Sequence, residues 1–117
     1  MKTYQYRPGN KYGNKKVTLF GVTFDSKREA QRFVDLVSMQ RAGKISDLHL
    51  QVPFELVPPI KNEAGKTIQR GVSYVADFTY MENGNFIVED AKGVRTEGYK
   101  LKKKLMLWRH GIQIKEV

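Results

Sequence analysis

The chain has 117 residues, a length that suits one domain with a single hydrophobic core. Its 21 Lys and Arg residues against 12 Asp and Glu give a formal net charge of +9, which favours a polyanionic partner such as nucleic acid. No apolar run is long enough to span a bilayer, the first residues lack the apolar core of a signal peptide, and the absence of cysteine excludes disulfides and thiolate zinc sites.

The chain is expected to begin with a basic arm that precedes the folded part. Residues 1–16 are polar, basic and rich in Gly and Asn, which predicts a flexible arm ahead of one α/β domain over residues 17–117. The β-branched and aromatic run 17–24 then predicts a strand or a short hairpin that bends at Gly21.

A helix is predicted over residues 25–44. Asp25 or Ser26 would cap its start and Gly43 would close its end. Its apolar residues recur at helical spacing, at Ala30, Phe33, Val34 and Val37.

Three strands are predicted to follow this helix. Residues 48–56 alternate apolar and polar side chains, and Pro53 indicates an edge strand because proline cannot donate a hydrogen bond to a neighbour. After a turn, residues 68–80 predict a second strand. The Asn-Gly pair within residues 82–85 predicts a tight hairpin into a third strand over residues 86–93.

The end of the chain predicts a second helix and a last strand. Thr96 would cap a helix over residues 97–110, Gly111 would end it, and residues 112–117 would form the strand. The expected order is helix, three strands, helix, strand, in which the second helix crosses between parallel strands. The fold class is therefore α/β, with a small mixed sheet flanked by helices.

The predicted hairpin brings two acids face to face. If Asn-Gly forms a two-residue loop, Asp77 lies directly opposite Asp90, with Lys92 on the same face. Glu89 then points to the opposite face, where we expect a structural or surface role. Two carboxylates in this position repel each other unless a cation lies between them, and Mg²⁺ binds carboxylates together with substrate phosphate. We therefore hypothesise a metal-dependent phosphodiesterase site.

The first helix offers a third acid. Glu29 lies close to the positions of Phe33 and Leu36 around an ideal helix, so its side chain should face inward in the first turn. The alternative is that Ser26 and Glu29 form a capping box, which would account for this acid without any site. The residues alone leave both interpretations open.

These features together resemble the PD-(D/E)XK nuclease superfamily. Its restriction-endonuclease-like core has the same order of elements, with acids matching Glu29 and Asp77 and a motif matching Asp90-Ala91-Lys92. The segments GVTFDSKREAQRF, VSYVADFTY, VEDAKG and LKKKLMLWRHGIQIKEV are similar to a phage-encoded branch with a Holliday-junction-resolvase-like core, known as a domain of unknown function. The similarity extends over residues 15–117. One difference is Ala76, where the superfamily commonly has proline.

The resemblance implies a DNA endonuclease that depends on Mg²⁺ or Mn²⁺. Asp77, Asp90 and the main-chain carbonyl of Ala91 would bind the metal, and Glu29 would bind it directly or through water. Lys92 would orient or help to deprotonate the attacking water and would stabilise the phosphate in the transition state.

Members of the superfamily often carry a further basic residue on the second helix. We expect Lys104 to take this role, with Lys100 as the second choice, because Lys104 borders a predicted apolar stripe in which Trp108 belongs to the core. That stripe consists of Leu101, Leu105 and Trp108. The alternative is that both lysines only extend along the edge of the core.

Further basic residues would contact DNA phosphates or would simply be solvated. On the second helix these are Lys102, Lys103 and Arg109, with the two lysines expected to face solvent. In the arm they are Lys15 and Lys16. His49 and His110 lie far apart in a chain without cysteine, which disfavours an HNH-type or zinc site.

The expected substrate is double-stranded or branched DNA, such as a Holliday junction in phage recombination, and coordinated cutting of a junction would imply a homodimer. The expected location is the cytoplasm of the bacterial host, and a membrane partner is disfavoured because no basic amphipathic helix carries a strong aromatic face. A second hypothesis is a non-catalytic nucleic-acid-binding module on a nuclease-like scaffold. A third is an RNA-directed nuclease or RNA-binding protein.

Overall fold

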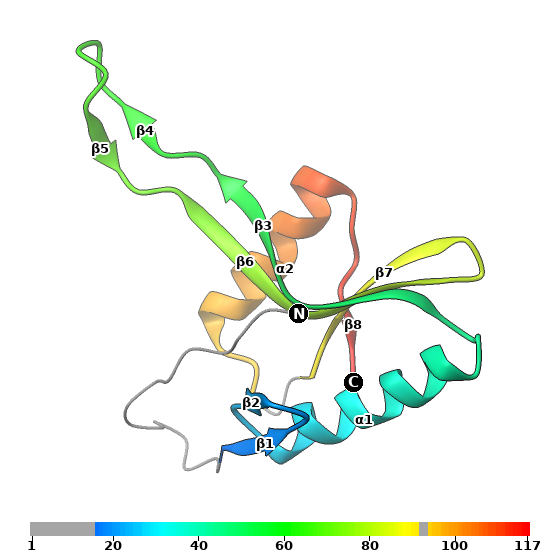
Figure 1. Ribbon diagram of the computed structural model, residues 1–117. Coiled ribbons are helices and arrows are strands. Elements are labelled where there is room, and N and C mark those ends of the chain that lie inside the picture. Colours follow the sequence, from blue (N-terminus) through cyan, green and yellow to red (C-terminus); the bar gives the residue numbers. More distant parts are fainter. Residues whose placement is uncertain (1–15, 92–93) are drawn as a thin grey trace.

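The structure, a computed structural model, describes residues 16–91 and 94–117 as ten elements. In chain order they are β1 (Val17–Leu19), β2 (Val22–Phe24), α1 (Lys27–Arg41), β3 (Ser46–Val57), β4 (Ile60–Lys61), β5 (Thr67–Gln69), β6 (Val72–Glu82), β7 (Asn85–Asp90), α2 (Glu97–His110) and β8 (Lys115–Glu116). The fold is mixed α/β with a small mixed sheet and two helices, as predicted (Figure 1). The predicted arm, residues 1–16, lies outside the described residues except for Lys16. Neither helix in the described part of the chain is long and apolar enough to cross a membrane.

The central sheet has four strands in the order β3-β6-β7-β8. The first three strands are antiparallel, and β8 runs parallel to β7, so α2 is the predicted crossover. The predicted edge position of Pro53 is confirmed, because β3 lies at the edge of the sheet.

Both helices begin and end at residues that the sequence indicates. Ser26, rather than Asp25, caps α1, because its Oγ accepts a hydrogen bond from the backbone N–H of Glu29 at 3.1 Å. Thr96 caps α2 in the same way through the N–H of Tyr99. Gly111 ends α2 with φ 67°, a left-handed conformation that glycine adopts without strain.

The hairpin between β6 and β7 has the predicted register. Both residues of the Asn-Gly turn have positive φ, 52° and 78°, as a type I′ turn requires. Regular pairing runs from Glu82 opposite Asn85 to Phe78 opposite Glu89. One further step in the same register sets Asp77 across from Asp90, the last residue of β7.

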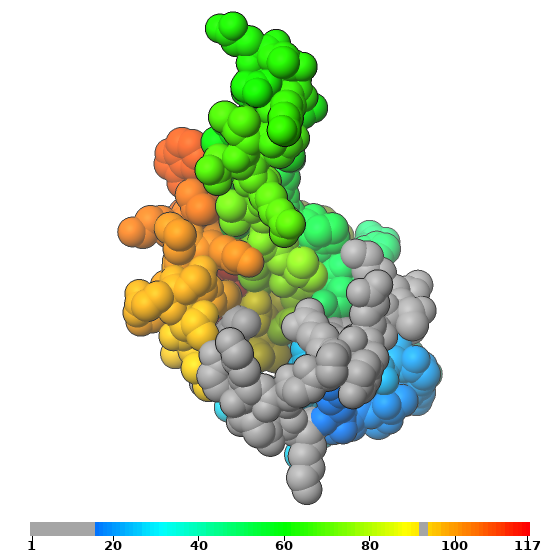
Figure 2. Space-filling model, turned by 90° about the vertical axis from the view of Figure 1, so that its left-hand side faces the viewer, coloured from blue at the N-terminus to red at the C-terminus, as the bar shows by residue number. Residues whose placement is uncertain are grey.

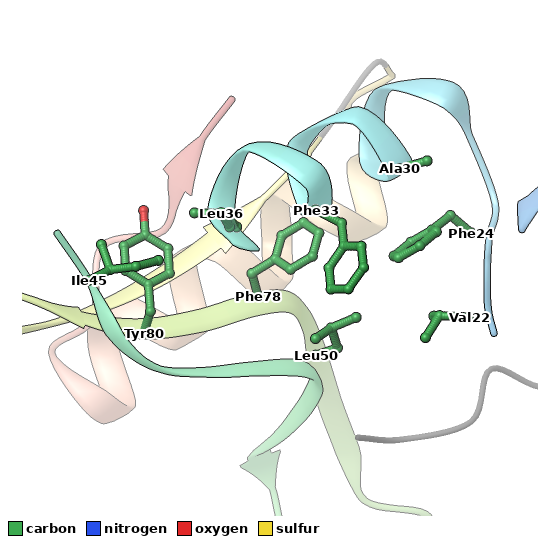
Figure 3. Packing of buried hydrophobic residues seen from close by; sticks show 9 residues of the cluster. All are labelled: Val22, Phe24, Ala30, Phe33, Leu36, Ile45, Leu50, Phe78 and Tyr80. Carbon is green, nitrogen blue, oxygen red and sulfur yellow. The ribbon is translucent and has the colours of Figure 1, made fainter. Parts of the chain in front are cut away.

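The two helices cover opposite faces of the sheet (Figure 1). Figure 3 shows the cluster under α1, which consists of Val22, Phe24, Ala30, Phe33, Leu36, Ile45, Leu50, Phe78 and Tyr80. The cluster under α2 consists of Leu56, Tyr74, Ala76, Val88, Tyr99, Met106 and Ile114. The sheet is thus buried on both sides.

At the level of Asp77, the buried side chains of β3 and β6 change from one face of the sheet to the other. Ala76 and Phe78 are two residues apart and should share a face, yet Ala76 lies in the α2 cluster and Phe78 in the α1 cluster. At this level the register of β3 with β6 is unchanged from Leu50 opposite Phe78 to Val52 opposite Ala76, but Gln51 between them has φ 54°. The predicted single apolar face of residues 48–56 is therefore divided between the two clusters. Asp77 lies where they meet.

Three predicted strands differ in length from the observed ones. The predicted strand over residues 68–80 is divided into β5 and β6, and β5 pairs with β4 in a separate two-stranded sheet. This β4–β5 arm extends away from the body of the molecule (Figures 1 and 2). The third strand ends at Asp90, and the last strand covers only Lys115–Glu116.

The orientation of α2 corrects the prediction for its apolar stripe. Trp108, expected in the core, is 78% exposed, and Leu101 is 56% exposed. The buried residues are instead Tyr99 and Met106, which lie seven positions apart and therefore on one side of the helix. This helix has two apolar stripes, and the stripe that contains Tyr99 packs on the sheet. The hydroxyl of Tyr99 also donates to Glu116 at 2.8 Å, which favours this orientation.

Candidate functional site

Three acids from three elements gather near the point where the two core clusters meet. Glu29 lies in the first turn of α1, Asp77 on β6 and Asp90 at the end of β7. Glu29 is 5% exposed and Asp90 is 2% exposed, although carboxylates are rarely buried without a compensating partner. The predicted convergence of these acids is thus present in the fold.

Ser26 supplies its half of the predicted capping box, whereas the carboxylate of Glu29 is directed towards β3. The backbone N–H of Glu29 is the group that Ser26 caps. The carboxylate of Glu29 faces Gln51, whose Nε2 donates to Oε1 at 3.0 Å. Sequence reasoning assigned no role to Gln51. Its one signal was its place as a polar residue in the alternating strand, now β3.

The acids of the hairpin accept hydrogen bonds from their own strands. The backbone N–H of Ala91 donates to Oδ2 of Asp77 at 2.9 Å. The hydroxyl of Tyr74 donates to Oδ2 of Asp90 at 2.6 Å, and burial together with this carboxylate raises the pKa of Tyr74. Tyr74 therefore remains a hydrogen-bond donor at any ordinary pH. No sequence pattern marked it, because an aromatic residue in a strand is equally typical of a core.

Burial and mutual repulsion dominate the electrostatics of these acids within the described part of the chain. Burial first, and then the charges of Glu29 and Asp90, raise the pKa of Asp77 to about 9. Burial and then the charge of Asp25 raise the pKa of Glu29 to about 7. Nearby negative charge contributes to both raised pKa values, so a cation placed among these acids would lower them.

The chemistry of this donor set fits a hard divalent ion, since carboxylate oxygens are the ligands that Mg²⁺ and Mn²⁺ prefer. Within residues 16–91 and 94–117, however, no three His, Cys, Asp or Glu side chains are arranged so as to hold one metal ion. Binding a single ion through Glu29, Asp77 and Asp90 would require these side chains to converge further. The predicted lysine of the motif, Lys92, lies outside the described residues, and Ala91 is the last residue described before it.

Glu89 lies on the opposite face of β7, as predicted, and has a structural role. It is fully buried, and Arg32 of α1 binds both of its carboxylate oxygens, Nε to Oε2 at 2.7 Å and Nη2 to Oε1 at 2.8 Å. The hydroxyl of Tyr80 also donates to Oε1 at 2.6 Å. This bidentate pair joins α1 to β7 next to the acids. Sequence reasoning did not identify Arg32, because nothing local links it to a residue 57 positions away.

The lysines of α2 are arranged differently from the prediction. Lys102 and Lys103, expected to face solvent, are half-buried, whereas Lys104 is exposed on the outer side. Lys103 forms an ion pair with Glu116 at 3.2 Å. Lys100 is exposed and lies 3.2 Å from Glu97 in the preceding turn. The rotation of α2 that buries Met106 accounts for all of these differences.

The other candidate basic residues occupy the ends of the elements. Arg109 docks the end of α2 on β3 through Glu55 at 3.0 Å and the carbonyl of Leu56 at 3.1 Å. His110 lies at the end of α2, as expected, where its Nε2 is 2.7 Å from the carbonyl of Glu55. His49 is exposed on β3, and Lys16 is half-buried just before β1. Lys15 lies outside the described residues.

Comparison with known proteins places the chain in one family. The family model described as "Protein of unknown function (DUF1064)" matches residues 9–115. No curated protein and no solved structure matches the chain. The expected resemblance to a domain of unknown function is thereby confirmed at the level of the family. Because the match covers nearly the whole chain, this protein belongs to the DUF1064 family.

Proposed function

We propose that this protein is a metal-dependent DNA endonuclease with a PD-(D/E)XK-type, restriction-endonuclease-like core. One observation carries the proposal: Glu29, Asp77 and Asp90 come from three separate elements, and the charges of Glu29 and Asp90 lie close enough to Asp77 to raise its pKa. A chain gains no stability from this arrangement on its own. Acids held together at such a cost are typical of sites that bind a cation.

In this proposal the chain's own residues position the reacting groups. Asp77 and Asp90 hold the ion from adjacent strands, together with the carbonyl of Ala91, and Glu29 holds it directly or through water. Lys92 orients the attacking water beside the phosphate. When bound, the divalent ion lowers the pKa of water and offsets the charge on the phosphate oxygens.

The reaction is hydrolysis of a phosphodiester bond. The water oxygen bonds to phosphorus, the bond from phosphorus to one sugar oxygen breaks, and that oxygen gains a proton as the water loses one. The proposed active site holds polar groups that steady the acids during this step, namely Gln51 on Glu29 and Tyr74 on Asp90. Both are donors, so they support the ionised form of the carboxylates.

The proposed substrate is DNA in the cytoplasm of a bacterial host. The net charge of +9 supports a polyanion, and much of it comes from basic residues outside the acid cluster, including four lysines in α2. Branched DNA such as a Holliday junction is the substrate that the resemblance favours, and its resolution would need two copies of the chain acting together.

A non-catalytic nucleic-acid-binding module is the second candidate. It is favoured by the hydrogen bonds that the acids already accept from Gln51, Tyr74 and the N–H of Ala91, because such bonds also suit a structural role. In that case the acids would hold the strands together and the basic surface would bind DNA without cutting it.

Cleavage assays separate the two candidates. The protein is incubated with supercoiled plasmid and with a four-way junction, in Mg²⁺, in Mn²⁺ and in EDTA. We expect nicking that requires the metal and falls about 100-fold or more in Asp90→Asn and in Lys92→Ala, because each removes a group that contacts the reacting atoms. Asp35→Asn, which removes an exposed carboxylate from α1, is the matched control and should cleave normally. Metal-independent binding without any cleavage would contradict the endonuclease proposal and support the binding module.

A further inference from the structure

The outer face of α2 exposes a tryptophan that the core does not use. Trp108 is 78% exposed and is the only tryptophan in the chain. On an ideal helix it lies about 160° around the axis from the buried Met106, so it points away from the sheet. Leu101, about 20° from Trp108, is also more than half exposed. Large apolar side chains gathered on a surface indicate a binding face rather than a core defect.

Lysines are interleaved with these apolar side chains. Lys104 lies about 40° from Trp108 around the helix, one turn earlier, on the same outer face. A shallow hollow of about 280 Å³ next to it is lined by Lys100, Lys103, Lys104, Leu107 and Gln113. Figure 2 shows side chains of α2, in orange, standing out from the surface beside the strands. The face therefore combines flat apolar contact area with positive charge.

This combination argues against two other occupants. A second copy of the helix would bring lysines against lysines, because α2 contains five Lys and Arg residues and one Glu. A lipid surface is disfavoured because α2 is basic but exposes only one aromatic side chain, Trp108. A nucleic acid strand meets neither objection, since its bases stack on aromatic rings while its phosphates pair with lysines.

We propose that the outer face of α2 binds a single-stranded segment of DNA, with a base stacked on Trp108 and phosphates at Lys100 and Lys104. The choice of DNA rests on the proposed function, which this inference deepens by naming the substrate class. The substrate is DNA in which unpaired bases adjoin a duplex, because only unpaired bases expose a face for stacking. Trp108 would then select the structure that is cut, while the three acids would act on the phosphate.

The single tryptophan makes the inference directly measurable in the unaltered protein. Its fluorescence is followed in EDTA, where no cleavage occurs, during titration with a thymidine oligonucleotide and with a duplex of equal length. We expect the oligonucleotide to quench the emission and the duplex to leave it nearly unchanged. Trp108→Ala should weaken binding of a labelled thymidine oligonucleotide about 10-fold or more, because stacking on an aromatic side chain contributes this much per base.

Matched variants identify the face. Phe86→Ala removes another exposed aromatic side chain, 51% exposed, from β7 and should leave single-strand binding unchanged. Lys104→Ala should reduce the slope of log affinity against log salt by about 0.7, the value for one phosphate contact on a single strand. Equal effects of Trp108→Ala and Phe86→Ala would overturn the proposal.

The remaining outcomes are also decisive. The proposal would be overturned by equal quenching with duplex and oligonucleotide. It would also be overturned by an emission that shifts with protein concentration alone, or by one that shifts only with vesicles of phosphatidylserine and phosphatidylcholine. The last two results would identify self-association or a lipid surface instead. Quenching that persists in a protein without nuclease activity would leave this inference standing while the proposed function failed, so the two can be told apart.

Discussion

Asp77 is the residue at which stability and the proposed function conflict most clearly. It lies at the exchange of faces in β6, between two apolar clusters and beside two other acids. The backbone N–H of Ala91 donates a hydrogen bond to Asp77. This bond does not offset the cost of burying the charged carboxylate beside other acids, so its pKa is still raised. A carboxylate selected only for stability would be replaced by a neutral residue at this position.

The pH dependence of stability should reveal this conflict. The pKa of Asp77 is raised from an ordinary 3.8 to about 9, and that of Glu29 from 4.5 to about 7. Groups with a raised pKa in the folded state contribute stability at low pH that is lost as the pH rises towards the folded pKa. In EDTA we therefore expect the free energy of unfolding to fall between about pH 4 and pH 9, measured by urea denaturation.

Replacement of the acid tests the cause of that fall. Asp77→Asn keeps an oxygen that accepts from Ala91 but cannot ionise, so the variant should be more stable than the natural chain at pH 9 by about 2 kcal/mol. The difference should vanish below about pH 4, where the acid is protonated in both the folded and the unfolded chain. Asp35→Asn, on the surface of α1, should follow the natural chain throughout. A pH profile that Asp77→Asn leaves unaltered would show that other groups determine it.

At the scale of elements, a single ion pair fixes α1 against the sheet. Arg32 binds both oxygens of the buried Glu89, and this contact sets the height of α1 and hence the position of Glu29 one turn earlier. Loss of the guanidinium would leave a carboxylate buried without a cation, which is far more costly than loss of a surface pair.

The expected consequence is a large loss of stability. Arg32→Met should lower the free energy of unfolding by about 3–5 kcal/mol, measured by urea denaturation at pH 7. Arg28→Met, on the exposed side of the same helix, should change it by less than about 0.5 kcal/mol. The double variant Arg32→Met with Glu89→Gln should recover part of the loss, because no buried charge remains unpaired. If the single variant were as stable as the control, the pair would have no structural role.

At the scale of the whole molecule, charge is unevenly distributed. The chain is strongly basic, yet its buried charges are mainly acidic: Glu29, Glu89 and Asp90 are all buried. Arg32 compensates one of these acids. The acids around Asp77 should therefore attract a small cation from solvent, while the outer surface attracts a polyanion.

A divalent ion should accordingly stabilise the folded chain. In Mn²⁺ at about 100 times its dissociation constant, the stabilisation is about 2.7 kcal/mol, which should raise the Tm at pH 8 by several degrees. EDTA should reverse the rise, and Asp90→Asn should abolish it. Asp35→Asn should retain it. A Tm that is indifferent to Mn²⁺ in the natural chain would remove the metal from the proposal, whatever its effect on DNA binding.

Features that depend on neighbours in the chain were accessible from the sequence. The caps at Ser26 and Thr96 and the Asn-Gly turn use hydrogen bonds or backbone angles within a few residues. The tight turn fixes the register of the hairpin from Glu82 and Asn85 to Phe78 and Glu89, and one further step in that register predicts Asp77 opposite Asp90. The acid pair, the most important part of the candidate site, was therefore predictable.

The tertiary structure decided what local patterns leave open. Two apolar stripes of α2 could pack on the sheet, and the better fit decides between them. Tyr99 and Met106 are buried, whereas Leu101 and Trp108 are exposed. This rotation of α2 also determines which lysines face solvent. The face exchange at Asp77, the role of Gln51 and the pairing of Arg32 with Glu89 all join residues distant in sequence. Such contacts depend on the free energy of packing the whole chain, so they cannot be predicted from a short segment of sequence.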